Sequence, residues 1–174
     1  MATFKIDTAH SEIGFKVKHL MISSASGVFK TFDATVEAEQ EDFSDAKITF
    51  EADIASIDTK NEQRDAHLKG EEFFNAEKFP KMTFVSTGIS KTTGSEFDLK
   101  GNLTIRDITK EVVLNVEYNG TVTDPWGQVK AGFEITGKIS REEFGLKWNA
   151  LTEAGGVVVG DEVKLHMNIE MQKN

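Results

Sequence analysis

Histidine and cysteine are the residue types from which chemistry would first be expected. The chain has four histidines, His10, His19, His67 and His166, and no cysteine. The histidines are too scattered to form a metal-ligand pair or a His-Glu-x-x-His zinc motif. With neither a thiol nor a Gly-x-Ser-x-Gly elbow, no nucleophile is set up for covalent catalysis. The sequence therefore predicts a protein that is not an enzyme and has no metal or other cofactor.

A short polar segment, Arg64-Asp65-x-His67-Leu68, has two interpretations. It can be a solvated helix with internal ion pairs, or it can place Arg64 and His67 against the polar or anionic head group of a ligand. His19 alternates in phase with apolar residues and is expected to point inward at a strand end. It is either a hydrogen-bonded structural histidine or a third head-group contact.

Most of the chain alternates apolar and polar residues with a period of two, which is typical of antiparallel strands with one wet face. In the first such stretch Ile13, Phe15 and Val17 alternate with polar residues, and in the last Val163 to Met171 does the same. Turn-forming residues separate the stretches. These turns are predicted at residues 23–27, 41–45, 92–95, 106–109 and 124–127. The pattern predicts about eight long strands.

Short helices are predicted at two interruptions of this pattern. Thr59 with Glu62 three residues later forms a capping box, which opens a helix that runs to Lys69 and stops at Gly70. Residues 71–78 add another turn before Pro80 ends it, and residues 140–144 form a further turn. We expect one all-β domain over residues 1–174, with one or two short helices covering an end.

Eight such strands either stack as a sandwich or close as a barrel, and closure removes exposed edges. An eight-stranded barrel can be filled by side chains or can hold one small ligand. Small residues such as Ala34, Ala52, Gly101 and Gly137 recur in phase with the large ones. They either leave a lined cavity open or allow close packing, and the pattern alone leaves both alternatives open.

Charge and composition limit the partners. The formal charge is −9, from 20 Lys+Arg and 29 Asp+Glu, so nucleic acids and anionic surfaces should repel the chain. No apolar run is long enough for a membrane-spanning helix, so stable membrane insertion is not expected. Because the chain opens without a basic and apolar leader, we expect a cytoplasmic protein, or a periplasmic one if an export signal has been removed.

A series of short motifs resembles the YceI-like family of bacterial lipid-binding proteins, in order and over nearly the whole chain. The motifs are Ile6-Asp7, His10-Ser11-x-Ile13-x-Phe15, Val17-Lys18-His19, Gly27-x-Phe29-x-x-Phe32, Ser56-Ile57-x-Thr59, Arg64-Asp65-x-His67-Leu68, Phe73-Phe74, Phe79-Pro80-x-x-x-Phe84, Gly101-x-Leu103-Thr104, Thr109-Lys110, Gly132-Phe133-x-x-x-Gly137-x-Ile139, Arg141-x-x-Phe144-Gly145 and Gly160-Asp161-x-Val163. The resemblance implies an elongated, lipocalin-like, eight-stranded antiparallel barrel. It also implies non-catalytic carriage or storage of one long lipid, such as a polyisoprenoid, an isoprenoid quinone or a fatty acyl chain or amide, and a possible homodimer.

The expected lining of such a cavity follows from the alternation. It comprises Phe15, Val17, Phe32, Phe50, Phe84, Leu99, Leu103, Leu114, Val116, Phe133, Ile135, Leu165 and Met167, with His19, Arg64 and His67 as head-group contacts. Ala52→Phe or Gly101→Phe is expected to block the ligand and leave the barrel folded. Two alternatives remain: a stress-response interaction module with a filled barrel, and an enzyme that uses His19 or His67 as its base.

Overall fold

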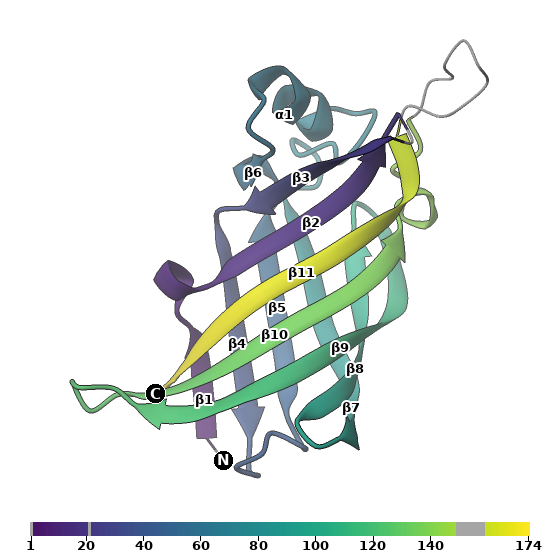
Figure 1. Ribbon diagram of the computed structural model, residues 1–174. Helices are drawn as coiled ribbons and strands as arrows, with labels where there is room; N and C mark the ends of the chain where they lie inside the picture. Colours follow the sequence, from purple (N-terminus) through teal and green to yellow (C-terminus); the bar gives the residue numbers. More distant parts are fainter. Residues whose placement is uncertain (1, 21, 149–158) are drawn as a thin grey trace.

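The computed structural model describes residues 2–20, 22–148 and 159–174, and most of them lie in β-strands (Figure 1). The strands are β1 (Ala2–Ile6), β2 (Glu12–His19), β3 (Ser23–Phe29), β4 (Phe32–Ala38), β5 (Lys47–Asp53), β6 (Ile57–Asp58), β7 (Lys81–Thr93), β8 (Glu96–Ile105), β9 (Ile108–Thr123), β10 (Val129–Ser140) and β11 (Val159–Lys173). The helical segments are η1 (Thr8–His10), η2 (Ile54–Ser56), α1 (Glu62–Lys69) and η3 (Glu142–Phe144). All strand pairs in the described residues are antiparallel.

These strands form a closed eight-stranded barrel. The eleven strand segments count as eight strands because three of the long strands are each interrupted and appear as two segments. β1 and β2 are two parts of the first strand, since both pair with β11 and η1 lies between them. β3 and β4 form the second strand in the same way, and β5 continues through η2 into β6. The pairing of β1 with both β4 and β11 closes the ring. The predicted fold class is confirmed.

One predicted turn was wrong. Residues 23–27 form most of β3, and the turn between β2 and β3 comes earlier, at Leu20 and Ile22. The sequence Ser-Ser-Ala-Ser-Gly has low strand propensity, but Gly27 lies directly opposite Phe15 on β2. A Cβ on Gly27 would lie 2.5 Å from the Phe15 ring, so the absence of a side chain lets the two strands pair here. Tertiary packing thus outweighs local propensity.

The helical predictions were correct in place but not in detail. α1 begins at Glu62 with Asn61 as its N-cap, whose Oδ1 accepts the Arg64 N–H at 3.0 Å. The predicted cap, Thr59, is instead buried and donates its hydroxyl to Asp65 Oδ1. Gly70 is the C-cap as predicted, whereas residues 71–78 form turns rather than a helix.

The helix covers one end of the barrel. Figure 1 shows α1 above the end at which β3 and β6 lie, while the N-terminal strand β1 lies at the opposite end. Among the described residues, no helix is long and apolar enough to cross a membrane.

Candidate binding cavity

The barrel contains a cavity of about 680 Å³. This volume is typical of small-molecule sites, which are mostly apolar with a few polar groups that orient the ligand. The predicted lining residues that border it are Phe15, Val17, Phe50, Phe84, Leu99, Leu103, Leu114, Val116, Phe133, Ile135, Leu165 and Met167, together with His19, Arg64 and His67. The barrel is therefore not the filled one that the interaction-module alternative requires.

One end of the cavity is closed by aromatic rings. Phe43, in the loop between β4 and β5, is buried, and its ring centroid lies 5.1 Å from Phe4, 5.3 Å from Tyr118 and 5.0 Å from Phe133. The Asp45 carboxylate holds this loop by accepting two backbone N–H groups at 2.9 and 3.0 Å. We call Phe43 and the three rings around it the aromatic plug.

The other end of the cavity is polar and reaches the solvent beneath α1. Asn61 and Gln63 line the cavity and are exposed. Arg64, His67 and His19 line it at the same end, so the structure brings the three head-group candidates to one mouth. Their contact with a ligand stays a prediction.

The two mouth residues on α1 are held by hydrogen bonds. Arg64 donates from Nε to Thr59 Oγ1 at 2.8 Å and from Nη2 to the Thr59 carbonyl at 2.7 Å. His67 Nε2 lies 2.6 Å from Glu72 Oε2, and its ring meets the Trp148 ring edge-on at 4.8 Å between centroids. The mouth is therefore preorganised, with two cationic or titratable groups fixed beside an apolar interior.

Arg141 is a cavity-lining residue that the sequence reasoning did not assign to the site. It is only 3% exposed, and its guanidinium donates to the carbonyls of Leu146, Trp148, Val159 and Gly160 at 2.5 to 3.1 Å. Burial lowers the pKa of Arg141. Its signal was the Arg141-x-x-Phe144-Gly145 motif, which could have identified a fixed arginine but not its position at the mouth.

Phe32 departs from the expected lining, and Ala52 and Gly101 depart from their expected role as small residues that leave room for a ligand. Phe32 does not border the cavity and packs outside it, with the cluster of Ile13, Phe29 and Ile54. Ala52, which is 0% exposed, lies in the same cluster. A Cβ on Gly101 would clash with the Phe84 ring and lie 2.8 Å from the Val85 carbonyl oxygen.

The small residues at positions 52 and 101 therefore make room for neighbouring side chains rather than for a ligand. Gly101→Phe is now expected to disrupt the barrel, contrary to the earlier expectation that it would only block the cavity. The alternation predicted which side chains point inward, but not which of them fill one another's space.

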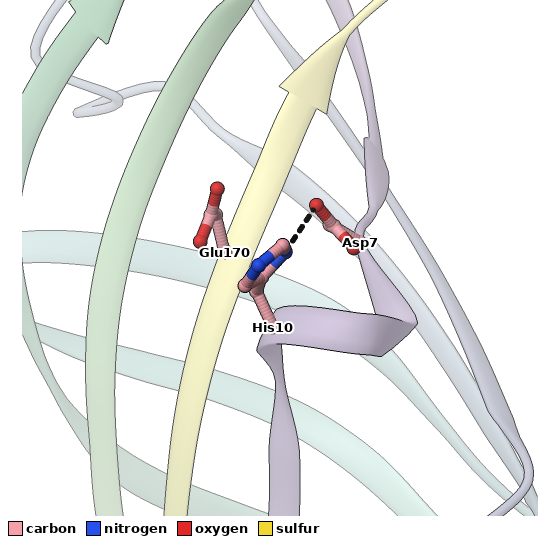
Figure 2. Close-up of side chains that lie close together, drawn as sticks. All are labelled: Asp7, His10 and Glu170. Atoms are coloured by element: carbon pink, nitrogen blue, oxygen red, sulfur yellow. Dashed lines mark hydrogen bonds and ion pairs between the residues drawn. The ribbon is translucent and has the colours of Figure 1, made fainter. Parts of the chain in front are cut away.

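A titratable cluster lies on the wall of the barrel, away from the cavity lining. Figure 2 shows Asp7, His10 and Glu170, none of which borders the cavity. Their metal-coordinating atoms, one histidine nitrogen and two carboxylate oxygens, lie within 4.8 Å of one another. Lys130 Nζ lies 2.7 Å from Asp7 Oδ2 and 3.7 Å from Glu170 Oε1, so an ammonium group already stands between the two carboxylates. The arrangement fits an ion-pair network that joins η1 to β10 and β11.

The network shifts the pKa values of its members. The hydrogen bond from Lys130 first, and that from His10 second, lower the pKa of Asp7 from 3.8 to about 2. The same Asp7 carboxylate raises the pKa of His10 above its ordinary 6.5.

Comparisons with known proteins agree with this architecture. The model of the YceI-like domain family matches residues 4–171. A UPF0312 protein of Staphylococcus aureus (strain USA300) is 42% identical over 171 residues, which cover 98% of this chain and 97% of that protein. A crystal structure of the Campylobacter jejuni YCEI protein has a TM-score of 0.76 and 33% identity, and the match covers 97% of this chain and 96% of that one.

Two more distant structures show the same fold. Burkholderia cenocepacia BcnA has a TM-score of 0.82 at 24% identity, with 95% of this chain and 98% of that one covered. A polyisoprenoid binding domain from Saccharophagus degradans has a TM-score of 0.70 at 12% identity, with 98% of each chain covered.

Fold and cavity together define a closed antiparallel barrel around a largely apolar cavity. The chain belongs to the YceI-like family, and the resemblance seen in its motifs is confirmed.

Proposed function

We propose that the protein binds one long-chain lipid inside the barrel and carries or stores it without chemical change. The observation that carries this proposal is the shape and polarity of the cavity: an apolar tunnel with an aromatic plug at one end and a polar mouth at the other. An amphiphile with one long tail matches this arrangement, with its tail in the barrel and its head at Arg64 and His67. A polyisoprenoid tail is the first candidate, because a neighbour of the same fold is described as polyisoprenoid binding.

Tail burial alone supplies enough affinity for such a complex. Each buried CH₂ group contributes about 0.8 kcal/mol, so a tail of about a dozen carbons contributes about 10 kcal/mol, which exceeds an entropy cost of binding of about 4 kcal/mol, the lower end of its range. Polar contacts at the mouth then set the orientation of the lipid rather than its affinity. We expect selection by tail length more than by head-group chemistry.

A binding role rather than catalysis is supported by the partners of the candidate base. His67 contacts the Glu72 carboxylate and the Phe73 and Trp148 rings, and these contacts include no hydroxyl or thiol that a histidine base could activate. We therefore propose that any change in a bound lipid occurs on another protein.

Native mass spectrometry of gently purified protein, followed by organic extraction, tests the proposal. We expect a discrete adduct that extracts as a prenyl or long-acyl species. A clean apo mass, with no uptake of added prenyl or acyl lipids, would contradict it. An adduct that is chemically converted during incubation would instead support an enzyme.

A further inference from the structure

The turn between β2 and β3 presents apolar side chains to solvent at the mouth of the barrel. Ile22 is 85% exposed and Leu20 is 40% exposed. Leu20 directly follows His19, which lines the cavity, and the Ile22 N–H donates to the His19 carbonyl at 3.3 Å. Figure 1 shows this turn at the same end of the barrel as α1. We call Leu20 and Ile22 the apolar tip.

The strands that carry the apolar tip are the basic part of an acidic protein. The chain has a net charge of −9, yet residues 13–32 contain no Asp or Glu and include Lys16, Lys18 and Lys30. Lys30 is neutralised by Asp58 at 3.0 Å. Within the part of the chain that the structure describes, Lys16 and Lys18 form no ion pair. Both are exposed.

Lysines also lie opposite one another across three neighbouring strands. Lys16 on β2 is in register with Lys164 on β11, which is in register with Lys138 on β10. Like charges directly opposite in a sheet are destabilising. All three are exposed, and among the residues described only Lys138 forms an ion pair, with Glu162 at 3.5 Å. An external anionic surface would relieve this repulsion.

We propose that the mouth end of the barrel docks transiently on a bilayer that contains anionic phospholipid. In the docked state Leu20 and Ile22 enter the interface, and Lys16, Lys18 and Lys164 face the phosphates. Apolar side chains flanked by lysines are the usual composition of an interfacial anchor. Since the rest of the molecule is acidic, the membrane repels the other orientations, and the cavity mouth faces the bilayer.

The docking proposal rests on the proposed function for its purpose, because the bilayer is the source or destination of the lipid. The binding step itself needs no bound lipid and can be tested alone. The probes are vesicles of phosphatidylcholine, with and without phosphatidylglycerol, and the measurement is co-sedimentation. We expect binding to the phosphatidylglycerol vesicles that falls as salt is raised, since salt screens the lysines.

Two sets of variants locate the contact. Leu20→Ser with Ile22→Ser should weaken vesicle binding by about tenfold or more, because it removes the apolar anchor. Lys16→Gln and Lys164→Gln should each weaken it by about fivefold. None of these four residues is buried, so the variants should keep the parent's melting temperature.

Trp126→Ser is the matched control. Trp126 is 83% exposed, as much as Ile22, but it lies in the turn between β9 and β10, at the end of the barrel opposite α1. The control should bind vesicles as the parent does. A loss with Trp126→Ser and none with the tip variant would overturn the proposal, and so would a parent protein that ignores both kinds of vesicle.

Lipid content, measured by native mass spectrometry on the same samples, separates the two proposals. A protein that carries lipid but binds no vesicle contradicts docking and supports the proposed function. A protein that binds anionic vesicles through the tip but never takes up lipid supports docking and contradicts the proposed function.

Discussion

Asp7 carries the most strongly perturbed carboxylate among the residues described. It accepts the Ala9 N–H at 3.1 Å, His10 Nδ1 lies 3.0 Å away, and Lys130 donates at 2.7 Å, while the side chain is 16% exposed. Its pKa in the folded protein, about 2, lies below the ordinary 3.8. The ionised Asp7 carboxylate therefore stabilises the fold at pH values above its ordinary pKa of 3.8, and this stabilisation is lost as the pH falls towards 2.

We expect Asp7→Asn to lower the free energy of unfolding by about 2 kcal/mol at neutral pH, because the shift in pKa measures the interactions of the charge. Asparagine can still cap η1, so the change tests the charge alone. In urea unfolding at a series of pH values, the free energy of unfolding of the parent should decline below pH 4. The variant should not show this decline. Asp33→Asn is the control, since that carboxylate is 58% exposed and 3.7 Å from Lys5. An equal loss in both variants would contradict the assignment.

Arg141 is a second residue whose geometry makes a sharp prediction. Its planar guanidinium holds the carbonyls of residues 146, 148, 159 and 160 together. Lysine keeps the positive charge but cannot bond four carbonyls in a fixed plane. We expect Arg141→Lys to lower the free energy of unfolding by about 2 kcal/mol or more, measured in urea. The exposed Lys138→Arg should change it little, and equal stability of parent and Arg141→Lys would show that charge alone suffices.

At the scale of elements, the loop between β4 and β5 sets the depth of the cavity. Phe43 adopts a positive φ of 63° in this loop, a conformation that non-glycine residues seldom adopt, and its ring completes the aromatic plug. Phe43→Ala removes the ring and joins its space to the cavity. We expect a loss of about 3 kcal/mol or more in unfolding free energy, and a shift of the extracted lipids towards longer tails. An unchanged tail distribution would place the end of the ligand short of the plug.

Ala34 on β4 offers the opposite change, since it lines the cavity and is buried. Ala34→Phe should place a ring in the cavity and shift the extracted lipids towards shorter tails, or prevent uptake. Glu37→Phe puts the same ring on the exposed face of the same strand and should leave the lipids unchanged. The measurement is the mass distribution after extraction, with thermal unfolding to check that both variants fold.

Much of this arrangement is predictable from the sequence, because a period of two decides which side chains point inward. Phe15, Val17 and Leu165 could be placed on the cavity wall in this way. The pattern does not specify cross-strand partners, so it could not show that Phe84 fills the space beside Gly101. Nor could it distinguish Asn61 from Thr59 as the helix cap, because both are good capping residues and burial of Thr59 decides between them.

At the scale of the whole molecule, the cavity volume limits how much of a lipid is enclosed. At about 30 Å³ for each water-sized unit, 680 Å³ holds on the order of twenty carbon-sized groups. A longer polyisoprenoid would leave part of its tail at the mouth, beside the apolar tip. Tail lengths recovered by extraction should therefore centre near this size, and much longer species should be bound less tightly per carbon.

The three residue pairs that join β1 to β11 also govern the order in which the molecule can fold. β1 is synthesised before the other strands of the barrel and β11 after them, so the barrel cannot close until β11 has been made. Contacts between such distant parts of a chain form slowly, because a long loop must be ordered first. Until then the edge of β1 that β11 covers and the inner apolar face are open to other nascent chains. Ring closure is therefore the step at which correct folding competes most directly with aggregation.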